Sequence, residues 1–414
     1  MSEFLKEYGD ILGLLAMPLT YGFVGWFTNW VALKMTFYPL KFIGIPPFLG
    51  WQGIIPRKAH KMAGKSVDVI TEKLIKIEEI FDRVDPKEVE KELKPIIDGV
   101  VSDVIKDVVD DINPKLWDLL PNPVRDQIIK NARSQSGTTI KGIIQEIRAN
   151  IYQVFDLKSM VLKSLTGDNV KLIVDMFQAV GGPEFKFIER SGLYFGFLLG
   201  LVQMGIWTLF PLWWTLPIQG VIVGFLTNWL ALRMIFRPLR EKEFLGGLFK
   251  FQGLFMKRQD QVSEKYAQLI ATEILTPKRI LKEILYGRAA EEVFTLIRHT
   301  VAKAVETTST IAKPVLSFTM GGENYNQLKT YIVERLTRLV PKSAEKLEAY
   351  LEKTLDLEKT MGDRMKDLSP EEFENILRSA FQEDEFLLVV VGAILGALVG
   401  LGQAIYMNPS IVGL

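Results

Sequence analysis

Long apolar stretches alternate with long polar ones along this chain. Four stretches are apolar over roughly the 20 residues that a helix needs to cross a bilayer. They are Ile11–Leu33, Leu193–Trp214, Leu216–Leu232 and Phe386–Met407. The third is the shortest and contains Pro217, Gln219 and Asn228, so its prediction as a span depends on its neighbours. We therefore expect an integral membrane protein with four transmembrane helices.

Two polar regions, residues 34–192 and 233–385, separate the predicted spans. Apolar residues recur in both regions at the three- and four-residue spacing of an amphipathic helix. Examples are Val67, Ile70, Leu74, Ile77 and Phe81 in the first region, and Leu269, Ile270, Ile274, Ile280 and Ile284 in the second. Prolines divide these patterns into helices of ordinary length. The sequence thus predicts an all-α protein whose two large polar regions are antiparallel helical bundles.

Basic residues cluster just after the first and third predicted spans. They are Lys34, Lys41, Arg57, Lys58, Lys61 and Lys65, and then Arg233, Arg237, Arg240, Lys242, Lys257 and Arg258. The turn at residues 211–216 and the tail after Met407 carry no charge. Because positive residues near spans remain in the cytoplasm, we expect both helical regions to be cytoplasmic and both termini to lie outside.

The chain also resembles itself. Residues 25–40, GWFTNWVALKMTFYPL, return at residues 224–239 as GFLTNWLALRMIFRPL, an offset of 199. The following loop gains one residue, and the Gln-Gly pair at 52–53 then matches the pair at 252–253. This offset of 200 persists into the second and fourth predicted spans. A constant register over half a chain indicates an internal duplication.

We therefore expect two tandem repeats, residues 1–213 and 214–414. Each repeat contains a span, a cytoplasmic helical region and a second span. Since each repeat crosses the membrane twice, both should have the same orientation, related by an axis along the membrane normal.

Polar residues recur inside the predicted spans. They are Thr28, Asn29, Thr227, Asn228, Gln203 and Gln403. A buried amide needs a hydrogen-bond partner, since hydrocarbon offers none. One interpretation is that these residues join neighbouring helices. The other is a pseudo-symmetric polar site that lines a path through the membrane.

Glycines spaced by four residues form a smooth face on the second and fourth spans. They are Gly192, Gly196, Gly200, Gly392, Gly396 and Gly400. Such a face lets two helix backbones approach closely, so we expect tight helix packing there.

The loops Phe42–Ile55 and Phe244–Phe255 are apolar and rich in Gly, and the first also in Pro. We expect re-entrant or interface-lying segments, each followed by a basic cluster that contacts anionic lipid headgroups. Positive-inside topology alone explains these charges equally well. The residues predicted for this interface are Trp30, Trp229, Trp51, Gln52, Gly53, Arg57, Lys58, Lys61, Gln252, Gly253, Lys257 and Arg258.

Composition then narrows the chemistry. The chain has no cysteine, and its only histidines, His60 and His299, are far apart in sequence. Thiolate chemistry is excluded, and most zinc and histidine catalysis is disfavoured. The 50 basic and 49 acidic residues disfavour a nucleic-acid binder. No phosphate-binding loop, nucleophile elbow or dinucleotide fingerprint is present. We therefore expect no enzyme, no metal and no cofactor.

The repeated motif Thr-Asn-Trp-x-Ala-Leu-Lys/Arg-Met-x-Phe-x-Pro-Leu, with Gln-Gly and a basic pair after it, resembles the bacterial YheB/YjiN-type membrane proteins, a family of unknown function. The resemblance covers nearly the whole chain and implies a multi-pass protein of the bacterial inner membrane. The family positions are Gly25, Thr28, Asn29, Trp30, Pro39, Leu40, Gln52, Gly53, Pro56 and Arg57. In the second repeat Met256 replaces Pro56, and the loop is one residue longer.

Three classes of function remain open. The first is lipid handling or membrane organisation, with an anionic phospholipid as partner. The second is a scaffold that forms homo-oligomers or binds a protein through the distal cytoplasmic helices. The third is a small-solute channel or transporter with its path between the repeats. We rank lipid handling first and the scaffold second. The channel ranks third, because no acidic residue in the predicted spans marks an ion pathway.

Overall fold

The computed structural model describes residues 2–45, 49–112, 121–247, 249–309, 322–378 and 385–407. Almost all of them are helical, as the sequence predicts, and strands are confined to two short hairpins. The chain divides into two compact units, each built from separate segments. The first unit comprises Met1–Val69, Leu162–Ala267 and Gly362–Leu414, and the second comprises Ile70–Val161 and Gln268–Met361. Both halves of the sequence therefore contribute to each unit.

Three helices of the first unit are long and apolar enough to cross a membrane, within the described residues. They are α9 (Val170–Leu209), α10 (Thr215–Phe236) and α20 (Glu385–Met407). These helices contain the second, third and fourth predicted spans. The first predicted span lies in α1 (Ser2–Phe37), which is not one of these three helices. The side chains of residues 1–12 are outside the part that the structure describes. A fourth span thus stays a prediction, and the uncharged tail after Met407 lies outside the described residues.

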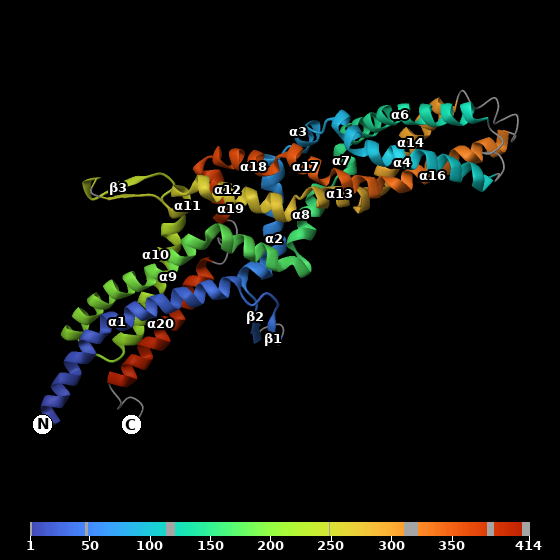
Figure 1. Ribbon diagram of the computed structural model, residues 1–414. Helices are drawn as coiled ribbons and strands as arrows, with labels where there is room; N and C mark the ends of the chain where they lie inside the picture. The colour runs from blue at the N-terminus through green and yellow to red at the C-terminus, as the bar shows by residue number, and fades with distance from the viewer. Residues whose placement is uncertain are drawn as a thin grey trace. The chain divides into compact units, whose positions relative to one another are not determined.

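These four helices form a bundle (Figure 1). Helix α1 packs along α9, and α10 packs along α20. Helix α9 also contacts α10, while α1 contacts α20 and α10. Met17, Leu216 and Ala404 meet in the bundle core, and Met204 and Trp207 of α9 pack against them, so all four helices share one apolar centre.

Shorter helices complete the first unit. They are α2 (Ile54–Val69), α11 (Leu254–Lys257), α12 (Gln259–Leu269) and α19 (Pro370–Arg378). Helices α8 (Leu157–Leu165) and α18 (Leu357–Lys366) begin in the second unit and end in the first. Helix α19 begins with a capping box. The Ser369 hydroxyl accepts the Glu372 N–H, while the Glu372 carboxylate accepts the Ser369 N–H.

Two two-stranded antiparallel hairpins follow α1 and α10. The first pairs β1 (Ile43–Ile45) with β2 (Leu49–Trp51), and the second pairs β3 (Lys242–Phe244) with β4 (Phe249–Phe251). They lie in the loops predicted to be re-entrant or interface-lying, of which residues 46–48 and 248 are outside the description. Three-residue strands are too short for the alternation that identifies a strand in sequence.

The second unit is also helical. Among the described residues, its helices include α3 (Ile77–Asp82), α4 (Pro86–Ile112), α6 (Asn122–Ala149), α7 (Ile151–Val154), α13 (Pro277–Tyr286), α14 (Ala290–Ser309), α16 (Gly322–Ala344) and α17 (Glu348–Leu355). The long helices close a ring in which α4 contacts α6, α6 contacts α14, α14 contacts α16, and α16 contacts α4. Val293, Ile297 and Val301 of α14 are buried at helical spacing. The helical class is thus confirmed, but the long helices of both polar regions pack into one shared bundle, whereas the sequence predicted a bundle for each region.

π-helical turns occur at Ile70–Leu74 and Ile270–Ile274, which differ by 200 residues. In each, the amide after the turn reaches back five residues: Ile75 N–H donates to Ile70 O, and Leu275 N–H to Ile270 O, both at 2.7 Å. The predicted apolar positions Ile70, Leu74, Ile270 and Ile274 are all fully buried. The same irregularity therefore occurs at matching places in both halves.

Candidate functional site

Glycines set the spacing between α1 and α9. A Cβ built on Gly25 would lie 2.2 Å from the Gly192 carbonyl oxygen, and one on Gly196 would lie 2.2 Å from the Tyr21 oxygen. One on Gly200 would lie 2.6 Å from the Pro18 Cα. Later residues of α9 thus meet earlier residues of α1, so the two helices are antiparallel. No side chain larger than hydrogen fits at these contacts.

The α10–α20 pair repeats this packing. A Cβ on Gly224 would lie 2.0 Å from the Gly392 oxygen, and one on Gly396 would lie 2.0 Å from the Gly220 oxygen. A Cβ on Gly400 would lie 2.4 Å from the Leu216 oxygen. The structure therefore brings all six sequence-predicted packing glycines to helix contacts.

The two asparagines each join one such helix pair. Asn29 Nδ2 donates to the Ile188 carbonyl at 2.6 Å, and Asn228 Nδ2 donates to the Leu388 carbonyl at 2.9 Å. Both side chains are buried, and neither Oδ1 has a hydrogen-bond partner among the described residues. Gly192 and Gly392 make room for these amides, because a Cβ there would lie 2.7 and 2.2 Å from the respective Nδ2. The asparagines therefore act first as interhelical ties.

The remaining predicted polar residues differ in their contacts. The Thr28 hydroxyl donates to the Gly25 carbonyl of its own helix, and the Thr227 hydroxyl donates to that of Val223. Gln203 is 1% exposed, and both its amide atoms lack a partner within the described part of the chain. Gln403 Oε1 likewise lacks one there. The threonines thus make local bonds, whereas the Gln203 amide has no partner in the part of the chain that the structure describes.

Cation–aromatic pairs lie at the ends of α1 and α10. The Lys34 ammonium is 6.0 Å from the centre of the Trp30 ring and 5.8 Å from that of Tyr38. The Arg233 guanidinium is 5.0 Å from the centre of the Trp229 ring. Trp30 and Trp229 are 37% and 41% exposed, and both cations are exposed. Each pair is thus open on its outer side.

The repeated Gln-Gly residues close the loops rather than facing outward. Gln52 Nε2 donates to the Leu40 carbonyl, and Gln252 Nε2 donates to the Leu239 carbonyl, both at 2.9 Å. A Cβ on Gly53 would lie 2.8 Å from the Phe37 carbonyl carbon, and one on Gly253 would lie 2.7 Å from that of Phe236. These predicted interface residues therefore fix the loop base to the preceding helix.

The other predicted interface residues fall into two groups. Trp51 is half-buried against Ala32, Ile54 and Leu388, and its Nε1 is buried without a partner in the described residues. The cations Arg57, Lys61 and Lys257 are exposed, whereas Lys58 and Arg258 are partly buried. Trp51 therefore anchors its hairpin to the protein.

Arg258 is engaged within the protein by a buried carboxylate. Its Nη1 is 2.6 Å from Glu184 Oε1, and Glu184 in α9 is 1% exposed. Glu184 Oε2 is buried and has no partner among the residues described. The sequence did not single out Glu184, because one glutamate in a helical pattern resembles any solvated residue. The only signal was its place in Gly181-Gly-Pro-Glu184, next to helix-breaking residues.

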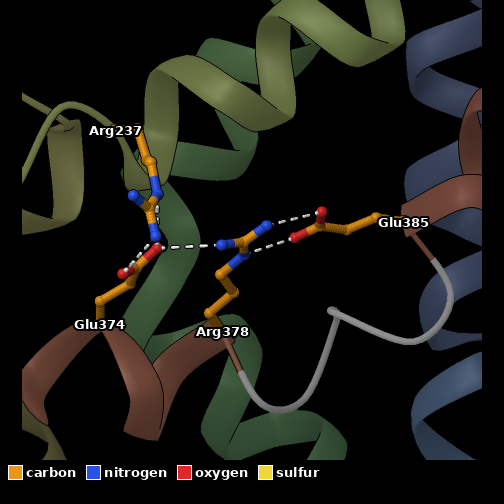
Figure 2. Close-up of polar contacts among 4 residues, drawn as sticks. All are labelled: Arg237, Glu374, Arg378 and Glu385. Carbon is orange, nitrogen blue, oxygen red and sulfur yellow. Dashed lines mark hydrogen bonds and ion pairs between the residues drawn. The ribbon is translucent and has the colours of Figure 1, made fainter. Parts of the chain in front are cut away.

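A second ion-pair network connects the ends of α10 and α20 (Figure 2). Glu374 in α19 accepts from Arg237 Nε and Nη2 at 3.1 and 3.2 Å, and from Arg378 Nη1 at 3.2 Å. Arg378 also forms a two-bond pair with Glu385, at 2.8 and 3.0 Å. The hydrogen bond to Glu385 raises the pKa of the Arg378 guanidinium, and the charge of Glu374 raises it further. Because two-bond pairs restrict orientation, the network fixes α19 against the first residues of α20.

The first half has a neutral counterpart of this network. At the matching offsets, Tyr38 replaces Arg237 and Gln178 replaces Arg378. The Tyr38 hydroxyl and Gln178 Oε1 are 3.5 Å apart. Val174 and Phe185 occupy the positions of Glu374 and Glu385. The matching positions thus lie close together in both halves, but the charges belong to the second.

We expect Glu374→Ala to destabilise the docking of α19 by about 2 kcal/mol, since it removes charge-assisted bonds to two arginines. Amide hydrogen exchange in α19 should become faster. The matched control is Glu371→Ala in the same helix, whose pair with Arg240 is 3.9 Å long and exposed. This control should change the free energy of opening of α19, measured by hydrogen exchange, by less than about 0.5 kcal/mol. Equal effects of the two substitutions would contradict a structural role for the network.

Comparisons with known proteins place the chain near bacterial membrane proteins. A family model described as "Protein of unknown function (DUF445)" matches residues 218–346. A "UPF0754 membrane protein" of Bacillus pumilus is 32% identical over 99 residues, which cover 24% of this chain and 25% of that protein. One of Shouchella clausii is 30% identical over 135 residues, covering 31% and 36%. One of Exiguobacterium sibiricum is 30% identical over 118 residues, covering 28% and 31%.

These matches span about a quarter to a third of the relatives' own length. No solved structure matches the chain. The chain is therefore a helical protein similar to bacterial membrane proteins of unknown function. The finer YheB/YjiN-type resemblance stays a prediction, because none of these descriptions uses that name.

Proposed function

We propose that the chain is a tandem duplication of residues 1–213 and 214–414, with four spans. Matching contacts support this. The Asn29 and Asn228 ties, the loop-closing Gln52 and Gln252, and the π-helical turns recur at offsets of 199 or 200 residues. In addition, the α1–α9 contact corresponds to the α10–α20 contact. Within this proposal, α1 is the first span.

The proposed orientation follows from charge. Lys34 and Arg233 lie in the last turns of α1 and α10, whereas residues 210–214, between α9 and α10, include no charged residue. Positive residues favour the cytoplasmic side of a bacterial inner membrane. The proposal thus places these ends and the helical regions in the cytoplasm, with both termini outside.

The proposed function is a non-enzymatic one: binding of anionic phospholipid headgroups in the cytoplasmic leaflet, and through it membrane organisation. The observation that carries it is the matched pair of exposed cation–aromatic contacts, Lys34 on Trp30 and Arg233 on Trp229. Tryptophan is favoured at the depth of the headgroups. At that depth, a cation that lies over the tryptophan ring can still contact a lipid phosphate on the side that faces away from the ring.

Neighbouring charges support the same site in the second half. Arg240 is exposed, and the side chain of Arg237 is 50% exposed despite its pair with Glu374. Each basic residue near an anionic surface contributes about 1 kcal/mol of attraction. A headgroup beside Arg233 would therefore experience several positive charges together.

The test is retention of phosphatidylglycerol through purification, measured by mass spectrometry of the lipid extract. Lys34→Glu combined with Arg233→Glu should lower retention at least about tenfold, since each reversal replaces an attraction of about 1 kcal/mol with a repulsion. Lys282→Glu is the control, because Lys282 is an exposed lysine of α13 outside the site. Zwitterionic lipid should be retained equally by all three proteins.

Unchanged phosphatidylglycerol retention in the double variant would remove the lipid proposal. The scaffold and the channel would then remain, because neither depends on Lys34 or Arg233. Partner binding through the helices of the second unit is in either case a separate proposal.

A further inference from the structure

The two hairpins have opposite chemistry although they occupy matching places. In the first, register pairs Ile43 with Trp51 and Ile45 with Leu49, so these four side chains share one face. Ile43, Ile45 and Leu49 are 67%, 71% and 74% exposed. Large aliphatic side chains are rarely so exposed together in water. This face therefore needs a cover.

The opposite face of the first hairpin has no charge either. Gly44 pairs with Gly50 there. A Cβ on Gly50 would lie 2.4 Å from Phe42 Cζ, so the Phe42 ring lies over this glycine. Phe42 is itself 42% exposed. The sequence from Phe42 to Trp51 contains no ionisable residue. Neither face of the hairpin therefore has a group that requires water.

The second hairpin carries an ion pair at the positions of those glycines. Glu243 pairs with Lys250 in the register, and their charged atoms are 3.0 Å apart. Lys250 also lies 3.5 Å from Glu241, and its carboxylate neighbours, Glu243 first, raise its pKa. These side chains are more than half exposed. One face of this hairpin therefore requires water.

Exposed apolar residues also occur on α1, the helix that precedes the first hairpin. Leu19, Phe23 and Trp30 are 66%, 58% and 37% exposed at helical spacing, and Tyr38, between α1 and the hairpin, is 41% exposed. Figure 1 shows both hairpins extending away from the helices of the first unit. The most direct cover for the exposed face is thus the same lipid that covers α1.

We propose that the β1–β2 hairpin inserts into the cytoplasmic leaflet with both faces in lipid, whereas the β3–β4 hairpin keeps its Glu243–Lys250 face in water. The first half of the protein would then enter the cytoplasmic leaflet more deeply than the second half. This inference rests on the proposed membrane orientation and deepens the proposed lipid contact. It does not depend on headgroup binding by Lys34 or Arg233.

The chain has no cysteine, so a single introduced cysteine can carry a nitroxide label without further changes. The variants are Ile45→Cys and Phe42→Cys on the two faces of the first hairpin, and Glu243→Cys on the second. Each is reconstituted into vesicles of phosphatidylethanolamine and phosphatidylglycerol. Electron paramagnetic resonance then measures collisions of the label with oxygen, which is lipid-soluble, and with a water-soluble nickel chelate.

For labels at positions 42 and 45, the ratio of collisions with oxygen to collisions with the nickel chelate should be severalfold higher than for the label at 243. The label at 243 should collide mainly with the nickel chelate. A nickel-favouring label at 45 would overturn insertion. A lipid-exposed label at 45 with a water-exposed label at 42 would instead mean that the hairpin lies flat. A lipid-exposed label at 243 would overturn the asymmetry. If Ile45→Cys does not fold, Ile43→Cys probes the same face.

This experiment and the lipid-retention test fail separately. Loss of phosphatidylglycerol retention in the Lys34→Glu, Arg233→Glu protein, together with a water-exposed hairpin, would leave the proposed function standing and remove only the insertion. Labels in lipid, together with unchanged phosphatidylglycerol retention in the double variant, would leave the insertion standing and remove the proposed headgroup binding.

Discussion

Gly192→Ala is expected to separate α1 from α9 and to destabilise the bundle by about 2 to 3 kcal/mol, as overpacking of a tight contact does. The added methyl would lie 2.2 Å from the Gly25 carbonyl oxygen and 2.5 Å from its carbon. Both are backbone atoms, so no side-chain rotation relieves the overlap. The methyl would also lie 2.7 Å from Asn29 Nδ2, so the tie to Ile188 should be lost as well. Titration with SDS in mixed micelles, followed by tryptophan fluorescence, measures the change.

Gly205→Ala in the same helix is the matched control. A Cβ at this exposed position has no atom within 4 Å apart from its own helix. Alanine is the better helix former, by up to about 1 kcal/mol, so this variant should be unchanged or more stable. Gly392→Ala and Gly402→Ala offer the same comparison in α20, where the Cβ of the first would lie 2.2 Å from Asn228 Nδ2 and that of the second would meet nothing. If Gly192→Ala were as stable as Gly205→Ala, the close contact would not exist.

Arg258→Ala is expected to lower the free energy of unfolding by about 3 to 5 kcal/mol, because it leaves a buried carboxylate without its partner. Glu184 is 1% exposed, and its second oxygen already lacks a partner in the described structure. The charge would then have neither water nor a counter-ion. The same micelle titration measures the loss.

A double variant separates charge from packing in this prediction. Arg258→Ala combined with Glu184→Leu removes both charges, and it should recover at least half of the lost stability, since a buried pair can be replaced by apolar groups at little cost. Lys366→Ala is the control, because its pair with Glu264 is 2.5 Å long but 65% exposed on the Glu264 side. It should cost less than about 1 kcal/mol. A double variant no more stable than Arg258→Ala would contradict the argument.

The helical architecture was predictable because its signal lies along the chain. Apolar periodicity identified the helical character of both units, and the glycines at every fourth position identified the packing faces of α9 and α20. The hydrogen-bonding partners of Asn29 and Asn228 were not predictable. They are the main-chain carbonyls of Ile188 and Leu388, and a carbonyl group has no signature in the residue that carries it.

The buried carboxylates were missed for a related reason. Glu184 and Glu374 are ordinary polar positions in a helical pattern, and each is buried beside an arginine distant in sequence, Arg258 and Arg237 respectively. Arg258 was predicted as a headgroup contact, whereas in the fold it pairs with Glu184. A local charge pattern reports how many charges a segment has, but not which of them meet.

The residue order alone thus determines the apolar segments, the helical class and the matching motifs of the two halves, because each depends on spacing between near neighbours. Folding in three dimensions selects the distant carboxylate that an arginine meets and the carbonyl that each buried asparagine binds. Those contacts join groups more than 100 residues apart, as Arg237 and Glu374 are, or Asn29 and Ile188. Two halves with matching motifs can therefore still carry different charges at matching positions, as Tyr38 and Arg237 do.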